Sequence, residues 1–431
     1  MMRRRCYCRD GGGSAAGAAA GGGGSNKFFK LLLMGLLVVG SHVMSTSSSS
    51  LGVVAAAASS STPVIGIMTQ PLPTNYNDGD KNIISNSTYY YIAASYVKWL
   101  ELGGARSIAI PYDATPDVLE DIFYQINGIL FTGGALDDIV PNSAKYLWKL
   151  IVQANNNDEN NDDENNENDF FPVWGTCLGF EWLIELACGS DTSSDSDLNE
   201  GNDTSCSLSS NYRTENVSLP LYNIPTTSLL YPPNTQMLDI VQHYNVTMNN
   251  HHRGITPQNF HNSSKLTNYW NITSTNYDIL LNSKDDTTTL EFVSTIEPKY
   301  PDKFPVYGVQ YHPEKNIFEY GTYPQGSSNI PYESIDHTIQ GITMSFELSK
   351  FFVNLTRTNM YLQQQQRQKN DRVRRRRIHE YTKFDTYPYV YTYPIQLGVY
   401  HFEQIYIIPP SSSVASSSSL SLSSSETATS S

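Results

Sequence analysis

The sequence is short of cysteine and of basic residues, and both shortages limit what the protein can be. Only five of its 431 residues are cysteine, and no pair of them has the close Cys/His spacing of a zinc site. Lysine and arginine number 28 against 42 acidic residues, which gives a net charge of −14. A nucleic-acid binder needs a basic face, and the one basic run, Arg372–Arg377, is interpreted as a solvated linker. Zinc binding and nucleic-acid binding are therefore both disfavoured.

A hydrophobic run long enough to cross a membrane is also missing. The apolar run Leu31–Val39 is much shorter than the roughly 20 residues that a membrane-spanning helix needs. Lys27 and Lys30 precede it and the small residues Ala55–Ala58 follow, which is a signal-peptide pattern that starts unusually late. We expect residues 1–62 to be a low-complexity leader with a signal peptide, with an uncleaved signal anchor as the alternative. The destination would be the secretory pathway, ending in the lysosome or vacuole or outside the cell.

Sequons and the number of cysteines both bear on export. A single Asn-x-Ser/Thr triplet carries no weight in a chain this rich in Asn, Ser and Thr, but seven triplets agree with the leader. They begin at Asn86, Asn202, Asn216, Asn245, Asn262, Asn271 and Asn354.

Outside the leader only three cysteines remain: Cys177, Cys188 and Cys206. In an oxidising compartment an odd number leaves one thiol free or paired between chains, and a bridge between Cys188 and Cys206 is possible.

Strand and helix patterns alternate along the first part of the folded region. Strand-like residues 63–68, 107–112 and 128–134 are separated by helical patterns at 89–102 and 115–126. This order indicates an α/β protein with a parallel sheet. Further elements follow the same patterns: helices at 144–154, 178–189 and 344–355, and strands at 170–175, 289–297, 304–312, 387–396 and 401–408. The segment from Ser190 to Ser264 is rich in loop-forming residues and yields no clear element.

Low-complexity stretches mark the limits of the domain. We expect one catalytic domain over residues 63–408 and a Ser-rich disordered tail over 409–431. The Asn/acidic tract 155–169 is interpreted as a loop insertion, because it lacks the spacing of a calcium loop. Residues 361–377 are expected to form a polar and basic linker.

The segment FPVWGTCLGFEWL carries the strongest chemical signal. It reads as a strand, a Gly-x-Cys-x-Gly turn and a helix, which is a nucleophile elbow with Cys177 in place of serine. The thiol would lie at a helix N-terminus, where the dipole lowers its pKa, and the backbone N–H of Leu178 would face a developing oxyanion. The alternative is a buried core cysteine, but a core cysteine has no need for the flanking glycines Gly175 and Gly179.

A second motif, GVQYHPEK, supplies a base and an acid. Residues i and i+2 of an extended chain point to the same side, so the carboxylate of Glu314 can hold the imidazole of His312 while the imidazole serves Cys177. The alternative is an ordinary histidine at the end of a strand. The elbow makes that alternative the weaker one.

Together GILFTGG, PVWGTCLGF and GVQYHPEK resemble class I glutamine amidotransferase-like hydrolases, and in particular the folate γ-glutamyl hydrolase family. ELGGARSIAIPYD, LEFVSTIE and FFVNLTR extend the resemblance over roughly residues 63–408. The resemblance implies a three-layer α/β sandwich around a central, mostly parallel sheet. It further implies that Cys177 is the nucleophile, His312 the general base and acid, and Glu314 the orienting acid. Gly133 and Gly134 would supply a second oxyanion donor beside Leu178.

The segment NHHRGIT resembles a family element in which a histidine reaches the active site. His252 is the better alignment there, and His251 is possible. Glu181 also matches the family, although its place on the elbow helix fits a structural role equally well.

The resemblance implies cleavage of γ-glutamyl bonds in folylpoly-γ-glutamates through a thioester, with no cofactor or metal and with a homodimer possible. Arg213 or Arg253 could contribute to binding the polyanionic substrate. A glutaminase subunit that feeds ammonia to a synthetase is the first alternative, and it would need a partner. A secreted glycoprotein that has lost catalysis is the second, although every expected catalytic residue type is present.

Overall fold

The computed structural model describes residues 62–72, 89–134, 140–155, 170–189, 206–210, 212–278, 290–323, 330–369, 387–399 and 402–410. All of them belong to one compact unit, Ser50–Ser431. The expected leader up to residue 61, the acidic insertion from residue 156 and the tail from residue 411 lie outside the described residues. The same holds for the sequons at Asn86 and Asn202 and for the basic run Arg372–Arg377.

A seven-stranded sheet forms the centre of the molecule, in the order β4-β1-β5-β6-β11-β10-β9. The first five strands pair in parallel and the last two are antiparallel. Their bounds are Arg106–Ile110 for β4, Val64–Met68 for β1, Gly128–Phe131 for β5, Val173–Thr176 for β6, Val306–Val309 for β11, Glu291–Pro298 for β10 and Trp270–Tyr277 for β9. The prediction of a mostly parallel central sheet is confirmed.

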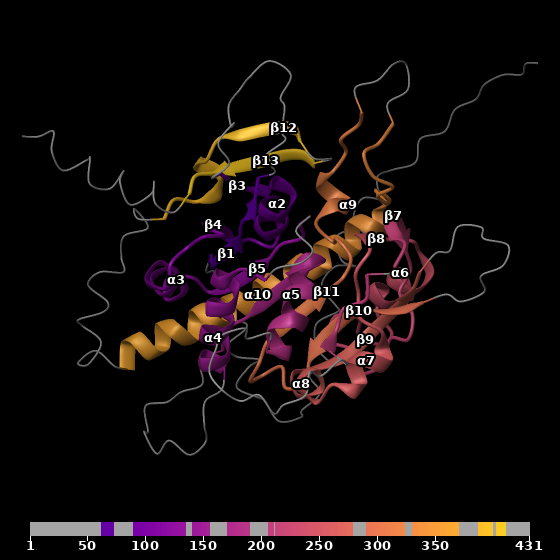
Figure 1. Cartoon of the computed structure of the whole chain (residues 1–431), viewed down its shortest axis with the longest axis horizontal. Coiled ribbons are helices and arrows are strands. Elements are labelled where there is room, and N and C mark those ends of the chain that lie inside the picture. Colours follow the sequence, from indigo (N-terminus) through magenta and orange to yellow (C-terminus); the bar gives the residue numbers. More distant parts are fainter. Residues whose placement is uncertain are drawn as a thin grey trace, which may run out of the picture. The chain divides into compact units, whose positions relative to one another are not determined.

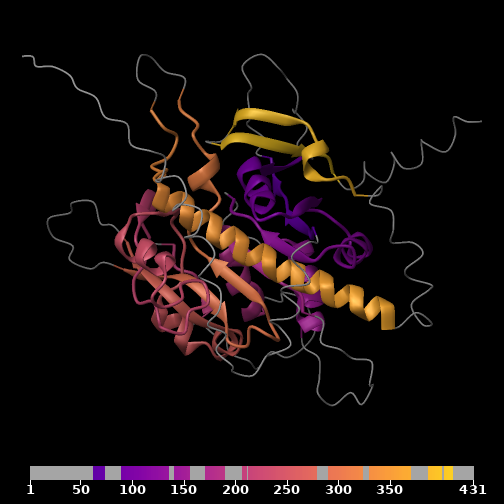
Figure 2. The same cartoon turned by 180° about the vertical axis from the view of Figure 1, so that it is seen from behind.

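Two hydrophobic cores cover the two faces of this sheet. In β1, Val64 and Met68 belong to one core while Ile65 and Ile67 belong to the other, as the two-residue period of a strand requires. Helices on the first face are α3 (Pro116–Phe123), α4 (Asn142–Asn155), α5 (Leu178–Cys188), α7 (Pro257–Asn262) and α8 (Ser264–Tyr269). Those on the second are α2 (Ala94–Leu102), α6 (Gln236–His243) and α10 (Ile339–Lys369), the last crossing the view in Figure 2. The chain is a three-layer α/β sandwich.

A second sheet joins segments from opposite ends of the domain. Its order is β12 (Ile395–Val399), β13 (Phe402–Ile408), β3 (Tyr90–Ala93) and β2 (Gln70–Pro71), and Figure 1 shows the late pair in yellow above the indigo α2. The helix predicted over residues 89–102 therefore starts too early. Its aromatic and branched first residues pair with β13 as a strand, and the helix begins at Ala94.

The sequence yields no clear element between Ser190 and Ser264, but the described part of this segment contains several short ones. It holds β7 (Thr214–Leu219) and β8 (Thr247–His251), which pair with each other, as well as α6 and α7.

Helix α10 continues to Lys369, so the prediction that a linker begins at residue 361 places its start too early. Gln-rich sequence favours a helix even without an apolar stripe. No helix in the described part of the chain has both the length and the hydropathy to cross a bilayer.

Candidate active site

Cys177 occupies a strained turn between β6 and α5. Its φ of 52° and ψ of −109° lie in a region that non-glycine residues rarely adopt. The turn is held by close packing, because a β-carbon on Gly179 would lie 2.1 Å from the carbonyl oxygen of Phe131. The amide of Cys177 donates to the carbonyl of Val309 at 2.9 Å, which ties the turn to β11. The predicted elbow geometry is confirmed.

His312 and Glu314 form a buried pair just beyond the end of β11. His312 Nδ1 lies 2.7 Å from Glu314 Oε1, and the two residues are 5% and 0% exposed. The amide of His312 donates to the carbonyl of Met248 at 2.8 Å. Because a carboxylate oxygen of Glu314 accepts a hydrogen bond from Nδ1–H, the other ring nitrogen, Nε2, is left to act as a base.

The nucleophile and the base meet at Gly133. A β-carbon on Gly133 would lie 2.7 Å from Cε1 of His312 and 3.4 Å from Cβ of Cys177. The three residues follow β5, β6 and β11, which are neighbours in the sheet. The carboxyl ends of parallel strands meet at one edge, and ligands of open α/β sheets bind there. A side chain at position 133 would fill the space between the imidazole and the nucleophile.

Tyr96, near the start of α2, is a site residue that no motif of the sequence identifies. Its hydroxyl lies 3.4 Å from His312 Nδ1 and accepts a hydrogen bond from the amide of Gly133 at 2.8 Å. Burial raises the pKa of Tyr96 well above its usual value, so the hydroxyl keeps its proton. The predicted oxyanion donor at Gly133 is therefore bound to Tyr96 in this structure. Gly134 ends a described segment, and a β-carbon there would meet the side chain of Gln70 at 2.8 Å.

The acidity of the thiol differs from the prediction. Burial raises the pKa of Cys177 well above its usual value, and the carboxylate of Glu181 acts in the same direction. The ammonium of Lys315 and the amide of Leu178 oppose this increase without overcoming it. The expectation that the helix N-terminus lowers the pKa is wrong in its net direction, because it ignored desolvation. The resting thiol is protonated, and its proton needs a nearby acceptor.

The adjacent histidines at the end of β8 have opposite environments. His251 is 4% exposed, its Nδ1 lies 2.7 Å from the carbonyl oxygen of Arg253, and burial lowers its pKa to about 3. The side chain of His252 is 43% exposed, and its Nδ1 lies 3.9 Å from a carboxylate oxygen of Glu215. The structure therefore buries the histidine that aligned less well. The assignment of His252 to the active site stays a prediction.

Arg253 is enclosed by acidic side chains of α5. One of its guanidinium nitrogens lies 3.6 Å from Glu181 and another bonds Glu185, and the arginine side chain is only 12% exposed. Gln310 donates to the second oxygen of Glu181 at 3.0 Å. The suggestion that Arg253 binds the substrate does not fit this arrangement. Arg213, by contrast, is exposed.

A buried ion pair adjoins the catalytic pair. Lys315 Nζ lies 2.7 Å from both carboxylate oxygens of Glu333, and Asn250 donates its side-chain amide to Glu333 at 2.7 Å. The carbonyl oxygen of Asn250 lies 4.0 Å from the sulfur of Cys177. These contacts join the segment after Glu314 to strand β8, which faces the nucleophile. Across the described ranges, no group of three His, Cys, Asp or Glu side chains has the arrangement of a metal site.

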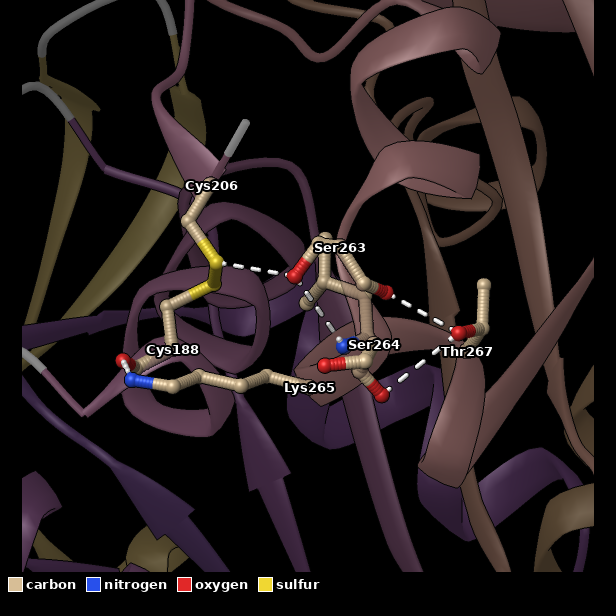
Figure 3. The surroundings of a disulfide bond; sticks show 7 residues. Cys188, Cys206, Ser263, Ser264, Lys265 and Thr267 are labelled. Carbon is tan, nitrogen blue, oxygen red and sulfur yellow. Dashed lines mark hydrogen bonds between the residues drawn. A yellow bond between two sulfur atoms is a disulfide. The ribbon is translucent and has the colours of Figure 1, made fainter. Parts of the chain in front are cut away.

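Cys188 and Cys206 form a disulfide, which confirms the possible bridge, and Cys177 is the free cysteine of the described residues. The bridge joins the end of α5 to the segment before β7 (Figure 3). Lys265 donates to the carbonyl of Cys188 at 2.9 Å, and the hydroxyl of Ser263 lies 3.1 Å from the sulfur of Cys206. The elbow helix is thus held by the strained turn at one end and by a covalent link at the other.

The model of the Peptidase C26 family matches residues 63–314. The chain belongs to this family. It is 33% identical to gamma-glutamyl hydrolase B of Dictyostelium discoideum, over 69% of this chain and 72% of the relative. It is also 33% identical to human gamma-glutamyl hydrolase, over 69% and 78% of the two chains, and to gamma-glutamyl hydrolase 1 of Arabidopsis thaliana, over 69% and 73%. The Peptidase C26 match contains Cys177, His312 and Glu314.

Proposed function

We propose that this Peptidase C26 member hydrolyses the γ-glutamyl bonds of folylpoly-γ-glutamates through a thioester on Cys177. One observation carries the proposal: a thiol on a strained elbow and a carboxylate-bound imidazole flank the same glycine at the edge of the sheet. This arrangement suits acyl transfer by a cysteine. The bond that is cleaved follows from relatives that are gamma-glutamyl hydrolases.

Acylation begins with the protonated thiol. Nε2 of His312 takes the proton of Cys177, Glu314 stabilises the imidazolium, and the sulfur attacks the γ-carbonyl carbon of a glutamyl residue. The amide of Leu178 stabilises the oxyanion. The tetrahedral intermediate collapses when His312 returns the proton to the departing α-amine. The C–N bond breaks, and the acyl group stays on sulfur as a thioester.

Deacylation uses the same groups with water. His312 removes a proton from water, the hydroxide attacks the thioester carbon, and the thiolate leaves and is reprotonated by the imidazolium. The products are a shorter folate and glutamate or an oligo-γ-glutamate. The Gly133 amide can join Leu178 as a donor only if it exchanges the hydroxyl of Tyr96 for the oxyanion.

Incubating purified protein with pteroyl-oligo-γ-glutamate and with free glutamine tests this function. We expect shortening of the γ-glutamyl chain by the wild type and none by Cys177→Ala, whose fold is checked by circular dichroism. Hydrolysis of glutamine alone would support the alternative of a glutaminase subunit. Inertness toward both substrates would support a protein without catalysis.

We further propose that the protein works in the secretory pathway. The disulfide supports this location, because such bonds persist in oxidising compartments. Five sequons fall on described residues, and all five asparagines are exposed: Asn216, Asn245, Asn262, Asn271 and Asn354. Digestion of protein from its native source with an endoglycosidase tests the proposal, and unchanged mobility on a gel would contradict glycosylation.

A further inference from the structure

The position of Glu314 depends on the short segment that follows it. Residues Lys315–Phe318 form α9, and Glu319 ends this helix. Lys315 and Glu319 are ionisable side chains that are only 3% and 4% exposed. Buried polar and ionisable groups persist only where hydrogen bonds or counter-charges hold them. The partners of these two residues therefore fix the segment that follows the orienting acid, Glu314.

One set of partners comes from the C-terminal strand β13, which lies beside α9 (Figure 1). The amide of Glu403 donates to Oε2 of Glu319 at 2.7 Å. In return, the amide of Tyr320 donates to Oε2 of Glu403 at 2.9 Å. Each glutamate thus accepts a backbone hydrogen bond from the other segment. This reciprocal contact is called here the glutamate latch.

A second contact runs from β13 toward the nucleophile. The ring of Phe402 lies 5.6 Å from Lys315 Nζ, within the range of a cation–π interaction. Lys315 in turn binds Glu333, and Glu333 accepts from the side chain of Asn250. The carbonyl of Asn250 faces the sulfur of Cys177. Packed and hydrogen-bonded groups therefore connect β13 to the segment after Glu314 and to the strand that faces Cys177.

The strand itself is firmly anchored. It pairs with β3 through four residues, from Ile405 opposite Ala93 to Ile408 opposite Tyr90. Ile405 and Ile408 are fully or almost fully buried. Beyond β3 the chain enters α2 directly, and Tyr96 on that helix contacts His312. The latch therefore connects α9 to a rigid base that also carries a residue of the site.

We propose that Glu319 and Glu403 are positioning residues, which hold Glu314 and through it the imidazole of His312 in the orientation that catalysis needs. The inference rests on the proposed function for its reaction. Its physical basis is that a displacement of about 1 Å at a reacting group can lower a rate on the order of 100-fold. If the latch were removed, the end of α9 would lose its hydrogen bonds to β13, and the carboxylate of Glu314 would lose its fixed support.

Three variants and one control test the proposal. Glu319→Ala and Glu403→Ala each remove one acceptor of the latch. Glu319→Gln keeps an acceptor oxygen without the charge, and it imitates the neutral carboxyl that burial favours by raising the pKa of Glu319 to about 7. Gln404→Ala is the control, because the next residue of a strand points to the opposite face. The measurements are kcat and KM for pteroyl-tri-γ-glutamate, the melting temperature, and the alkylation rate of the Cys177 peptide followed by mass spectrometry.

We expect both alanine variants to lower kcat by up to about 100-fold while KM stays near the wild-type value. Glu319→Gln should restore most of kcat, and Gln404→Ala should match the wild type. The alanine variants should also alkylate more slowly at Cys177, because a displaced imidazole accepts the thiol proton less well. Glu403 is exposed, so Glu403→Ala keeps the test valid if Glu319→Ala does not fold.

A lower melting temperature with an unchanged kcat would show that the latch is only structural and would overturn the inference. Equal values of kcat for all four variants and the wild type would do the same. If the wild type cleaves no γ-glutamyl substrate, the proposed function fails and the alkylation rates still test the latch. Equal alkylation rates in that case would overturn the positioning role as well.

Discussion

The region from β5 to α5 and the region from Cys206 to Tyr277 border the same site but are built in different ways. The first region consists of regular parallel strands and helices whose residues are buried in the hydrophobic cores. The second consists of shorter elements that also contribute side chains to the cores. These elements are held in addition by separate polar contacts, such as Arg253 between Glu181 and Glu185, and by one disulfide. The first region therefore depends on close packing, and the second depends on packing together with individual links.

The largest effect is expected where packing leaves no room. Gly179→Ala would place a β-carbon 2.1 Å from the carbonyl oxygen of Phe131, a backbone atom of β5 that is held by pairing with β6. We expect a loss of roughly 4 kcal/mol or more in the free energy of unfolding, or failure to fold. Unfolding in guanidinium chloride measures this loss of free energy. In the other region Gly254→Ala is the matched control, because its β-carbon would lie 3.1 Å from the ring of Tyr212. Equal losses for both variants would refute the comparison.

A smaller effect is expected from removing the covalent link. Cys188→Ala/Cys206→Ala opens a loop between residues 18 positions apart, and loop entropy predicts a loss of about 2 to 3 kcal/mol. The measurement is the shift in the unfolding midpoint. Wild-type protein treated with a reductant is the control and should shift by a similar amount. A shift larger than that of Gly179→Ala would reverse the order of the two regions.

The effect that is smallest at neutral pH develops only as the pH falls, and it tests the buried histidine of the second region. Burial lowers the pKa of His251 to about 3, below its unfolded value of about 6.5. The unfolded chain therefore binds a proton at a higher pH than the folded protein. The stability due to neutral His251 is complete above about pH 6.5 and is lost as the pH falls toward 3. His251→Gln should flatten the dependence of the melting temperature on pH over this interval, and an unchanged slope would contradict it.

The residues of the site differ in how well the sequence predicts them. Cys177, His312 and Glu314 could be found because each lies in a local motif whose spacing fixes its geometry. Tyr96 and the pair of Lys315 and Glu333 could not, because their partners are distant in the sequence and no spacing reveals them. The predicted direction of the shift in the pKa of Cys177 was wrong for a similar reason. A helix terminus is visible in the sequence, but the depth of burial depends on the whole fold.

The short elements between residues 206 and 269 escaped assignment for another physical reason. Strand β8 has the sequence TMNNH, and its buried positions include the polar Thr247 and Asn249. Such a strand shows no alternation of apolar and polar residues. Its polar groups are satisfied by contacts such as the bond from Thr247 to the carbonyl of Leu219 on β7. A strand stabilised in this way becomes recognisable only when its partner is known.

The pairing of β13 with β3 also has a consequence for biosynthesis. The ribosome makes β3 early and β13 only after every other described element. Until residue 408 has left the ribosomal tunnel, α9 has no latch and the second sheet lacks β13. The nascent chain therefore carries its nucleophile long before the support of its orienting acid exists. The contacts that hold Glu314 can form only after translation of the domain has reached its last strand.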